Sequence, residues 1–318
     1  IRYLARSRGL GDVYKRQASL DESTFWSKVG LLDGDPENRG SVPLKEENIE
    51  RLDEYMRAFN QPVSRVSLEQ GEYANTGFTQ WGASGLAAAW AEENTRESIF
   101  NAFRRKETFA TTGTRIAVRF FGGYNLSSID LNSESLVSEA YQKGVTMGSD
   151  LLHNENKIPE FLVWAQRDKN GAPLQRIQII KGWIDNNSGR PKEKVFDVVC
   201  SDGMQPDPIT NRCPDNGARV NINDCSISTN VGSSELKTVW KDPEFAPDDK
   251  TFYYVRVLEN PTCRWSTWDA IKAGYKPREG LHETIQERAW SSPIWYIPEQ
   301  SDVEVVPLGG TIQLRNID

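Results

Sequence analysis

The stretch SGLAAAWAEENTRESIFNAFRRKETFATTGTRIAVR, residues Ser84–Arg119, predicts a buried strand, a capped helix, a second strand and a tight turn. Leu86–Trp90 is a short apolar run, which suits a buried strand. Asn94 and Glu97 form a capping-box pattern, so a helix should begin directly after Asn94. Residues Thr108–Gly113 are β-branched, aromatic or small, which indicates a second strand that packs closely and then turns. We therefore expect a strand–helix–strand unit.

Strands dominate the chain beyond this unit. The apolar runs Phe161–Gln166 and Leu174–Trp183 are joined by Asp168–Gly171, whose sequence DKNG is typical of a hairpin turn. Further predicted strands are Val195–Cys200, Ser234–Trp240, Phe252–Leu258 and Ser292–Ile297. Short strands at this spacing predict a β-sandwich-like domain with short helices over residues 120–298, followed by a tail at 299–318.

Length and composition narrow the class of protein. The chain has 318 residues, more than the ~250–300 that a single core usually supports, so we expect two domains. No apolar run approaches the roughly 18 residues that a membrane-spanning helix needs, so no membrane span is predicted. The net charge of −7 disfavours contact with nucleic-acid phosphates.

The first seventeen residues, IRYLARSRGLGDVYKRQ, differ from the rest in composition. The segment DVYKRQ resembles the translation of an adapter used in transposase-based sequencing, so we interpret residues 1–17 as a scar of metagenomic assembly. A basic arm for nucleic acid is the alternative. Without this segment the chain carries 33 basic and 44 acidic residues, a net charge of −11, which strengthens the prediction that it binds no nucleic acid. A signal peptide upstream of such a break would not be observable.

Several long blocks of the chain resemble a bacterial family known as domain of unknown function 3604. The blocks occur in the family's order and span roughly Leu20 to Pro298. They are WAEENTRESIFNAFRRKETFATTGTR (Trp90–Arg115), MGSDL (Met147–Leu151), FLVWAQRDKNGAPLQRIQIIKGW (Phe161–Trp183), FYYVRVLENPTCRWSTWDA (Phe252–Ala270) and QERAWSSPIWY (Gln286–Tyr296). Blocks of this length are far more specific than a short motif.

This resemblance implies kinship with the polymerase-and-histidinol-phosphatase (PHP) metallohydrolases, which hold divalent metal ions in a distorted β/α barrel. The fold class it predicts is α+β, with residues 18–119 as the C-terminal remnant of such a barrel and the β-sandwich-like domain after it. Most metal ligands of the family lie upstream of the counterpart of Ala18–Asp21. The chain has only two histidines, His153 and His282, and neither has the spacing of a metal ligand. We therefore expect divalent metal ions in the full-length parent and assign no metal ligand here.

Three residues are candidates for a catalytic role at the mouth of the expected barrel. Glu92 and Asn94 follow a strand, where loops supply catalytic groups in barrel enzymes. The alternative is that Asn94 only caps the helix and Glu92 is solvated. Arg115 follows a glycine turn and could reach an oxyanion, or it could form a salt bridge with Glu107 or Glu92.

Five residues near the C-terminus are candidates for substrate binding. They are Arg264, Trp265, Glu287, Arg288 and Trp290. Arginine and tryptophan together can form a platform for a carbohydrate or an anion. The alternative, which we favour, is an Arg–Glu pair that locks a loop beneath two indoles.

All four cysteines lie in the second predicted domain. Cys200 and Cys213 flank a loop rich in Gly, Pro and Asn, and we predict a disulfide between them, worth roughly 3 kcal/mol in the chain-entropy model. The partners of Cys225 and Cys263 stay open. Paired cysteines in a loop-rich β structure favour an oxidising compartment, so we expect a periplasmic or secreted protein.

Two functional hypotheses follow. The first is the C-terminal fragment of a PHP-like, metal-dependent hydrolase that acts on a phosphoester or related ester and is inactive as this fragment. The second is a non-catalytic β-sandwich that serves as a binding or interaction module. The substrate, the metal and the oligomeric state are not set by these residues.

Overall fold

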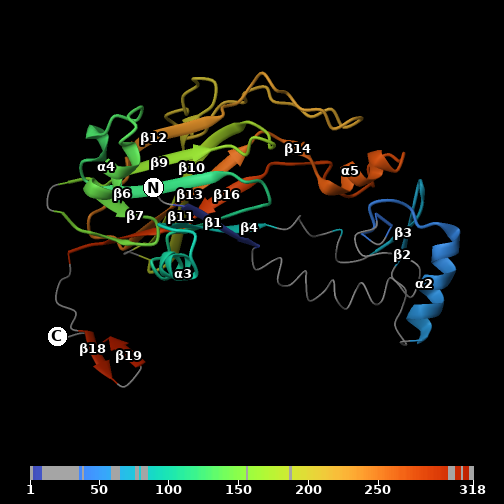
Figure 1. Ribbon diagram of the computed structural model, residues 1–318, viewed down its shortest axis with the longest axis horizontal. Coiled ribbons are helices and arrows are strands. Elements are labelled where there is room, and N and C mark those ends of the chain that lie inside the picture. Colours follow the sequence, from blue (N-terminus) through green and yellow to red (C-terminus); the bar gives the residue numbers. More distant parts are fainter. Residues whose placement is uncertain are drawn as a thin grey trace.

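The computed structural model describes residues 3–8, 36–37, 39–58, 65–75, 79, 85–154, 157–185, 188–299, 305–308 and 311–314. Two β-sheets lie face to face in the middle of the molecule (Figure 1). The large sheet has the strand order β1-β4-β5-β16-β13-β10-β11, and β17 pairs with both β13 and β8. Its strands are β1 (Tyr3–Arg8), β4 (Leu86–Ala91), β5 (Thr108–Thr111), β8 (Asp150–Leu152), β10 (Leu174–Ile184), β11 (Pro191–Cys200), β13 (Thr251–Glu259), β16 (Arg288–Ser291) and β17 (Ile294–Ile297).

The small sheet has the order β12-β9-β6-β7 and is antiparallel throughout. Its strands are β6 (Ala117–Gly123), β7 (Gly144–Thr146), β9 (Glu160–Gln166) and β12 (Glu235–Lys241). The other elements are α2 (Glu46–Ala58), β2 (Arg65–Leu68), β3 (Gly71–Ala74), α3 (Arg96–Arg104), η2 (Leu126–Ser128), α4 (Leu136–Lys143), β14 (Thr262–Cys263), α5 (Trp265–Lys272), β15 (Thr284–Ile285), β18 (Val305–Leu308) and β19 (Thr311–Leu314).

The main core fills the space between the two sheets. Alternate residues of each strand point into it, such as Phe120 and Phe161 from the small sheet and Ile179 and Val255 from the large one. Helix α3 packs its Ala102 against the outer face of β4, and α4 packs on the outer face of the small sheet. Figure 1 shows these two helices on opposite sides of the sheets. The sandwich is therefore covered on both sides by short helices.

The barrel expected over residues 18–119 is wrong. Strands β4 and β5 do flank a helix, but they pair antiparallel, with Leu86 opposite Thr111 and Ala89 opposite Thr108. A β/α barrel requires parallel strands that are buried on both faces. Instead Ala110 is exposed in β5, and β5 continues through β16 into the same sheet as β13 and β10. The described part of the chain thus forms a β-rich fold with no barrel.

The physical reason is that a strand–helix–strand pattern does not specify strand direction. Helix α3 has nine residues, and Lys106 adopts a left-handed turn with φ of 57° directly after it. This turn returns the chain at once beside β4, where the backbone N–H of Trp90 donates to the carbonyl of Glu107 at 3.0 Å. The helix cap is Thr95, whose hydroxyl accepts from the backbone N–H of Ser98, one residue later than the predicted cap Asn94.

The turn Asp168–Gly171 forms, but it does not join a hairpin. The backbone N–H of Gly171 donates to the carbonyl of Asp168 at 2.9 Å. Strands β9 and β10 on either side lie in different sheets, so the connection crosses from one sheet to the other. Both strands have an apolar face, and stacking these faces across the core buries more apolar surface than pairing the strands edge to edge would.

Candidate functional site

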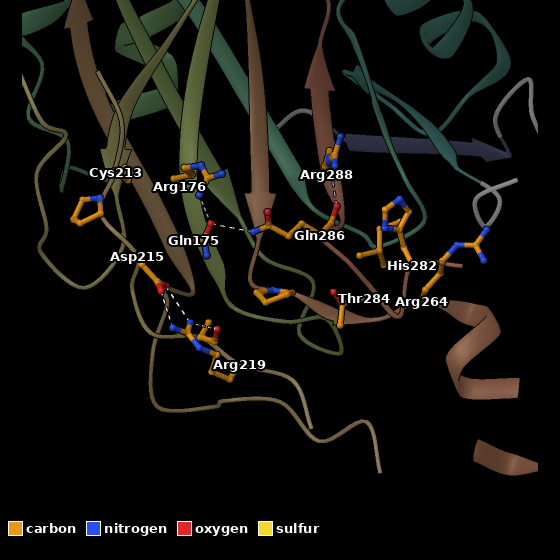
Figure 2. A pocket seen from close by; sticks show the side chains of 14 residues that line it. Gln175, Arg176, Cys213, Asp215, Arg219, Arg264, His282, Thr284, Gln286 and Arg288 are labelled. Atoms are coloured by element: carbon orange, nitrogen blue, oxygen red, sulfur yellow. Dashed lines mark hydrogen bonds and ion pairs between the residues drawn. The ribbon is translucent and has the colours of Figure 1, made fainter. Parts of the chain in front are cut away.

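A cleft of about 790 Å³ opens at the end of the large sheet where β10 begins. Three segments that are far apart in the sequence line it (Figure 2). They are Gln175 and Arg176 at the start of β10, part of the loop after β11, and the chain around β14–β16. Ile177 and Ala289 point into the core, so Arg176 and Arg288 project from the outer face of the same sheet.

The lining of this cleft is strongly basic. It contains Arg176, Arg219, Arg264, Arg288 and His282, against a single carboxylate, Asp215. We call it the arginine cleft. Because the protein as a whole has a net charge of −7, this local excess of positive charge is distinct from its surroundings. Clefts lined by one sign of charge concentrate ligands of the opposite sign.

Arg176 is partly buried, and the arginines around it outnumber the carboxylates. Burial lowers its pKa, and the nearby Asp197 carboxylate only partly offsets this effect. The Arg176 Nε lies 3.6 Å from Asp197 Oδ2 and has no hydrogen-bond partner. Arg256 and Arg288 add repulsion. An anion bound beside Arg176 would relieve that repulsion.

Asp215 neutralises only one arginine of the cleft. Arg219 donates to it through two nitrogens, at 3.2 and 2.7 Å, as Figure 2 shows. These hydrogen bonds lower the pKa of the Asp215 carboxyl to about 2, so it stays ionised at neutral pH. Among the described residues, no carboxylate lies within ion-pairing distance of Arg288, whose Nε donates to the carbonyl of Gln286 at 3.2 Å.

Two disulfides hold the walls of the cleft. One joins Cys200 to Cys213 with a Cα–Cα distance of 5.7 Å, and the other joins Cys225 to Cys263 with a distance of 5.6 Å. The first ties the loop after β11 to the end of that strand. The second ties the same region to β14, a pairing that the sequence left open. The loop that carries Arg219 is thereby fixed to the sheet that carries Arg176.

Comparison with known proteins gives one match, to a family. The family model described as "Protein of unknown function (DUF3604)" covers residues 8–298. The chain belongs to the DUF3604 family. No curated protein matches it, and no solved structure matches it. The matched range includes part of the first seventeen residues, and β1 (Tyr3–Arg8) pairs with β4 along its whole length.

Four of the five predicted substrate-binding residues of this DUF3604 chain line two separate cavities. Arg288 lines the arginine cleft, whereas Glu287 and Trp265 line a second, smaller cavity. Arg264 borders both. Trp290 lines neither of the two, and lies opposite Arg256 across β13 and β16. The alternation of side chains along one strand causes this division.

The structure separates the three residues expected at the barrel mouth. Glu92 and Asn94 follow β4, and Arg115 follows β5. Because these strands are antiparallel, their C-terminal ends lie at opposite ends of the sheet. Glu92 forms a salt bridge of 3.8 Å with Arg105 rather than with Arg115. All three side chains are exposed, and they do not form one site.

No group of three or more His, Cys, Asp or Glu side chains in the described part of this DUF3604 chain is arranged to hold a metal ion. His153 Nδ1 lies 2.8 Å from the hydroxyl of Tyr296, and His282 lines the arginine cleft. Among the described helices, none is both long and apolar enough to cross a membrane.

The residues that sequence reasoning missed are Arg176 and Arg219. Arg176 stands in an alternating strand, where an arginine usually marks a solvated face. Arg219 stands in an irregular loop. The only signal was the predicted disulfide between Cys200 and Cys213, which fastens the chain just before Arg219 to the end of a strand.

Proposed function

We propose that this chain is a non-catalytic binding module whose ligand is anionic and binds in the arginine cleft. The observation that carries the proposal is the set of four arginines and one histidine around a single carboxylate. Guanidinium groups match carboxylate, sulfate and phosphate groups through two parallel hydrogen bonds. The cleft therefore suits a ligand that carries such groups.

The other polar groups of the cleft favour an acidic glycan among such ligands. Gln175, Gln286 and Thr284 line the cleft and provide amide and hydroxyl groups that can bond to sugar hydroxyls. The indole of Trp265 lines the second, smaller cavity and not the arginine cleft. Recognition in the arginine cleft therefore rests on charge and hydrogen bonding rather than on stacking against tryptophan.

The metal-dependent hydrolase implied by the resemblance stays a prediction. Its divalent metal ions need a cluster of carboxylates and histidines, and the described residues of this chain do not fit that requirement. We therefore derive no hydrolytic step from these residues, on an ester or on any other substrate.

A periplasmic or secreted location is part of the proposal. Both pairs of cysteines are bonded, and structural disulfides persist mainly in oxidising compartments. Thiol titration of the unfolded protein, purified without reductant, tests this. We expect no free thiol before reduction and four after it, whereas four free thiols before reduction would contradict the proposal.

Calorimetric titration tests whether the arginine cleft binds anions. The probes are inorganic sulfate, a polyuronate fragment, a neutral glycan of equal length and a short DNA duplex. We expect the sulfate and the polyuronate to bind with an affinity that falls as salt rises, and the neutral glycan not to bind. Preference for the duplex would overturn the glycan assignment.

Variants of Arg288 test whether the anionic ligand binds in the arginine cleft. Arg288→Ala should weaken polyuronate binding about tenfold to a hundredfold, because a hydrogen bond to a charged group contributes ~1.5–3 kcal/mol. Arg288→Lys should weaken binding less than Arg288→Ala does, because lysine keeps the positive charge but lacks the planar guanidinium that forms two parallel hydrogen bonds. The matched control is Arg96→Ala, at an exposed arginine of α3 outside the cleft lining. An equal loss in Arg96→Ala would refute the assignment.

A further inference from the structure

A second cavity, of about 400 Å³, lies on the opposite face of the same strands. Val255, Val257 and Ala289 point into the sandwich core. By the alternation of side chains, Glu259, the last residue of β13, and Glu287, just before β16, continue the same face at the end of the sheet. The turns that cross between the sheets close this end, and Arg115 N–H in one donates to Asp168 Oδ2 in the other at 2.8 Å. We call this space the carboxylate cavity.

Glu259 is the unusual group of the carboxylate cavity. Its residue is fully buried, with 0% of its surface exposed, and neither carboxylate oxygen has a hydrogen-bond partner of normal geometry. The Thr114 hydroxyl and the backbone N–H of Ala172 lie close enough to lower the pKa of Glu259, but they do not offset the effect of burial. A buried carboxyl group with so little compensation is costly, and native proteins seldom keep one without a use.

Glu287 reinforces the negative character of the cavity. It stands beside Glu259 on the neighbouring segment, where the backbone N–H of Glu259 donates to the carbonyl of Glu287 at 3.0 Å. Residues paired in this way have side chains about 5 Å apart at Cβ. One oxygen of Glu287 accepts from the Thr112 hydroxyl. The two carboxyl groups therefore border one small cavity.

Two indoles of α5, Trp265 and Trp268, line the same cavity as these carboxyl groups. The cation that borders the cavity, Arg264, is engaged elsewhere. It stacks over Trp265 at 4.6 Å and donates to Ser266 and to the carbonyl of Thr79 at 2.8 and 2.9 Å. Lys272 Nζ lies 5.5 Å from the ring centre of Trp268. The cavity thus combines two indoles with two carboxyl groups for which the described residues provide no salt bridge.

We propose that the carboxylate cavity binds an organic cation, an alkylammonium or a guanidinium group, between the two indoles and the carboxylates of Glu259 and Glu287. Aromatic walls with carboxylates recognise such cations through the electron-rich ring face. A bare metal ion of the hard type needs six or more oxygen ligands, and the rest of this lining is largely apolar. An anion would be repelled by the two carboxyl groups when they are ionised.

Proton release is the signature of such binding. Burial raises the pKa of Glu259 to about 8, with Glu287 and Asp168 adding to the effect. The charged groups that act on it are Glu287 on the segment beside it and Asp168 on the crossing turn, and Arg264 before α5 borders the same cavity. A bound cation needs the ionised form, so the affinity should rise about tenfold per pH unit up to pH ~8 and then level off.

Calorimetry on the full chain with methylammonium, guanidinium, glucose and calcium as probes tests the proposal. At pH 7 we expect the two organic cations to release close to one proton each, measured in two buffers that differ in ionisation enthalpy. Glucose or calcium binding in their place would overturn the proposal, as would organic-cation binding that does not depend on pH.

Three variants separate this site from a structural role. Glu259→Gln should abolish the proton release and weaken binding at least tenfold. Gly171→Ala would place a methyl group 2.8 Å from Glu259 Oε1 and should weaken binding by filling the space without changing any charge. Trp268→Ala, at a side chain that is 40% exposed, should weaken binding several-fold while the fold is kept. Arg96→Ala, at an exposed arginine of α3 outside the lining of this cavity, should leave cation binding unchanged, and unaltered binding in all three variants would refute the site.

Discussion

The arginine cleft and the carboxylate cavity are neighbours of opposite charge that share Arg264 and Ile285. Consecutive residues, Glu287 and Arg288, point to opposite faces of one strand, and each serves a different site. The difference between them is solvent access. In the cleft, charges stay ionised beside water, whereas in the cavity Glu259 is held neutral at pH 7 by burial. Burial, more than residue type, decides how each charge behaves.

The largest expected effect concerns Glu259 and the pH dependence of stability. Its pKa is about 8 in the folded protein and near 4.5 when unfolded, so the folded state binds more protons between these values. Stability should therefore fall as pH rises from ~4.5 to ~8, by about 5 kcal/mol from this group alone. Glu259→Gln should lack that fall and be more stable than the native chain at pH 9. Urea unfolding at pH 5, 7 and 9 measures it, and parallel curves for the two proteins would contradict the burial argument.

The two disulfides provide a matched pair of variants, one for each site. Cys225 and Cys263 border the cavity and close 38 residues, whereas Cys200–Cys213 closes 13 beside the cleft. Loop entropy predicts losses of about 4 and about 3 kcal/mol, respectively, for the double serine variants. We expect the first pair to impair cation binding and the second to impair anion binding. If loss of the Cys225–Cys263 disulfide impaired anion binding and loss of Cys200–Cys213 impaired cation binding, each disulfide would not stabilise the site beside it.

Reversing the charge of Arg288 should weaken ligand binding at only one of the two sites. Arg288→Glu should weaken polyuronate binding about a hundredfold, since it removes a charged hydrogen bond and adds repulsion. Methylammonium binding should not weaken, because Arg288 is a positive charge near Glu287. A loss of both affinities would show that the two ligands share one site.

The smallest expected effect comes from Asp215. Asp215→Asn would free Arg219 from its exposed ion pair and should strengthen sulfate binding about two- to threefold, because exposed pairs contribute little. Titration at low salt is the measurement. The control, Asp185→Asn, removes a different carboxylate that pairs with Lys192 and should leave sulfate binding unchanged. Weaker sulfate binding in Asp215→Asn would show that the pair positions Arg219 for the ligand.

Sequence patterns predicted the elements of this protein better than their assembly. The strand, helix and strand of residues 86–111 form close to the predicted positions, because apolar runs and caps are local signals. Strand direction is not local, so the antiparallel pairing of β4 with β5 was missed. The turn at Asp168 likewise forms, but core packing sends β10 into the other sheet.

The candidate sites were predictable only in part, for the same reason. Arg264, Trp265, Glu287 and Arg288 lie in conspicuous blocks of the sequence and do border the two cavities. Their division between two opposite faces needed the register of β16 against β13. Glu259 is an ordinary glutamate at the end of a predicted strand, and only its complete burial distinguishes it.

The most direct measurement of the central claim is an NMR titration of the full chain with sulfate and, separately, with methylammonium. The account predicts that sulfate shifts the Arg288 Nε–H signal and that methylammonium shifts the indole N–H signals of Trp265 and Trp268, assigned through Trp→Phe variants. Each ligand should leave the other set of signals nearly unchanged. Shifts of the same signals by both ligands, or no shifts in either set, would contradict the existence of two sites of opposite charge on one strand.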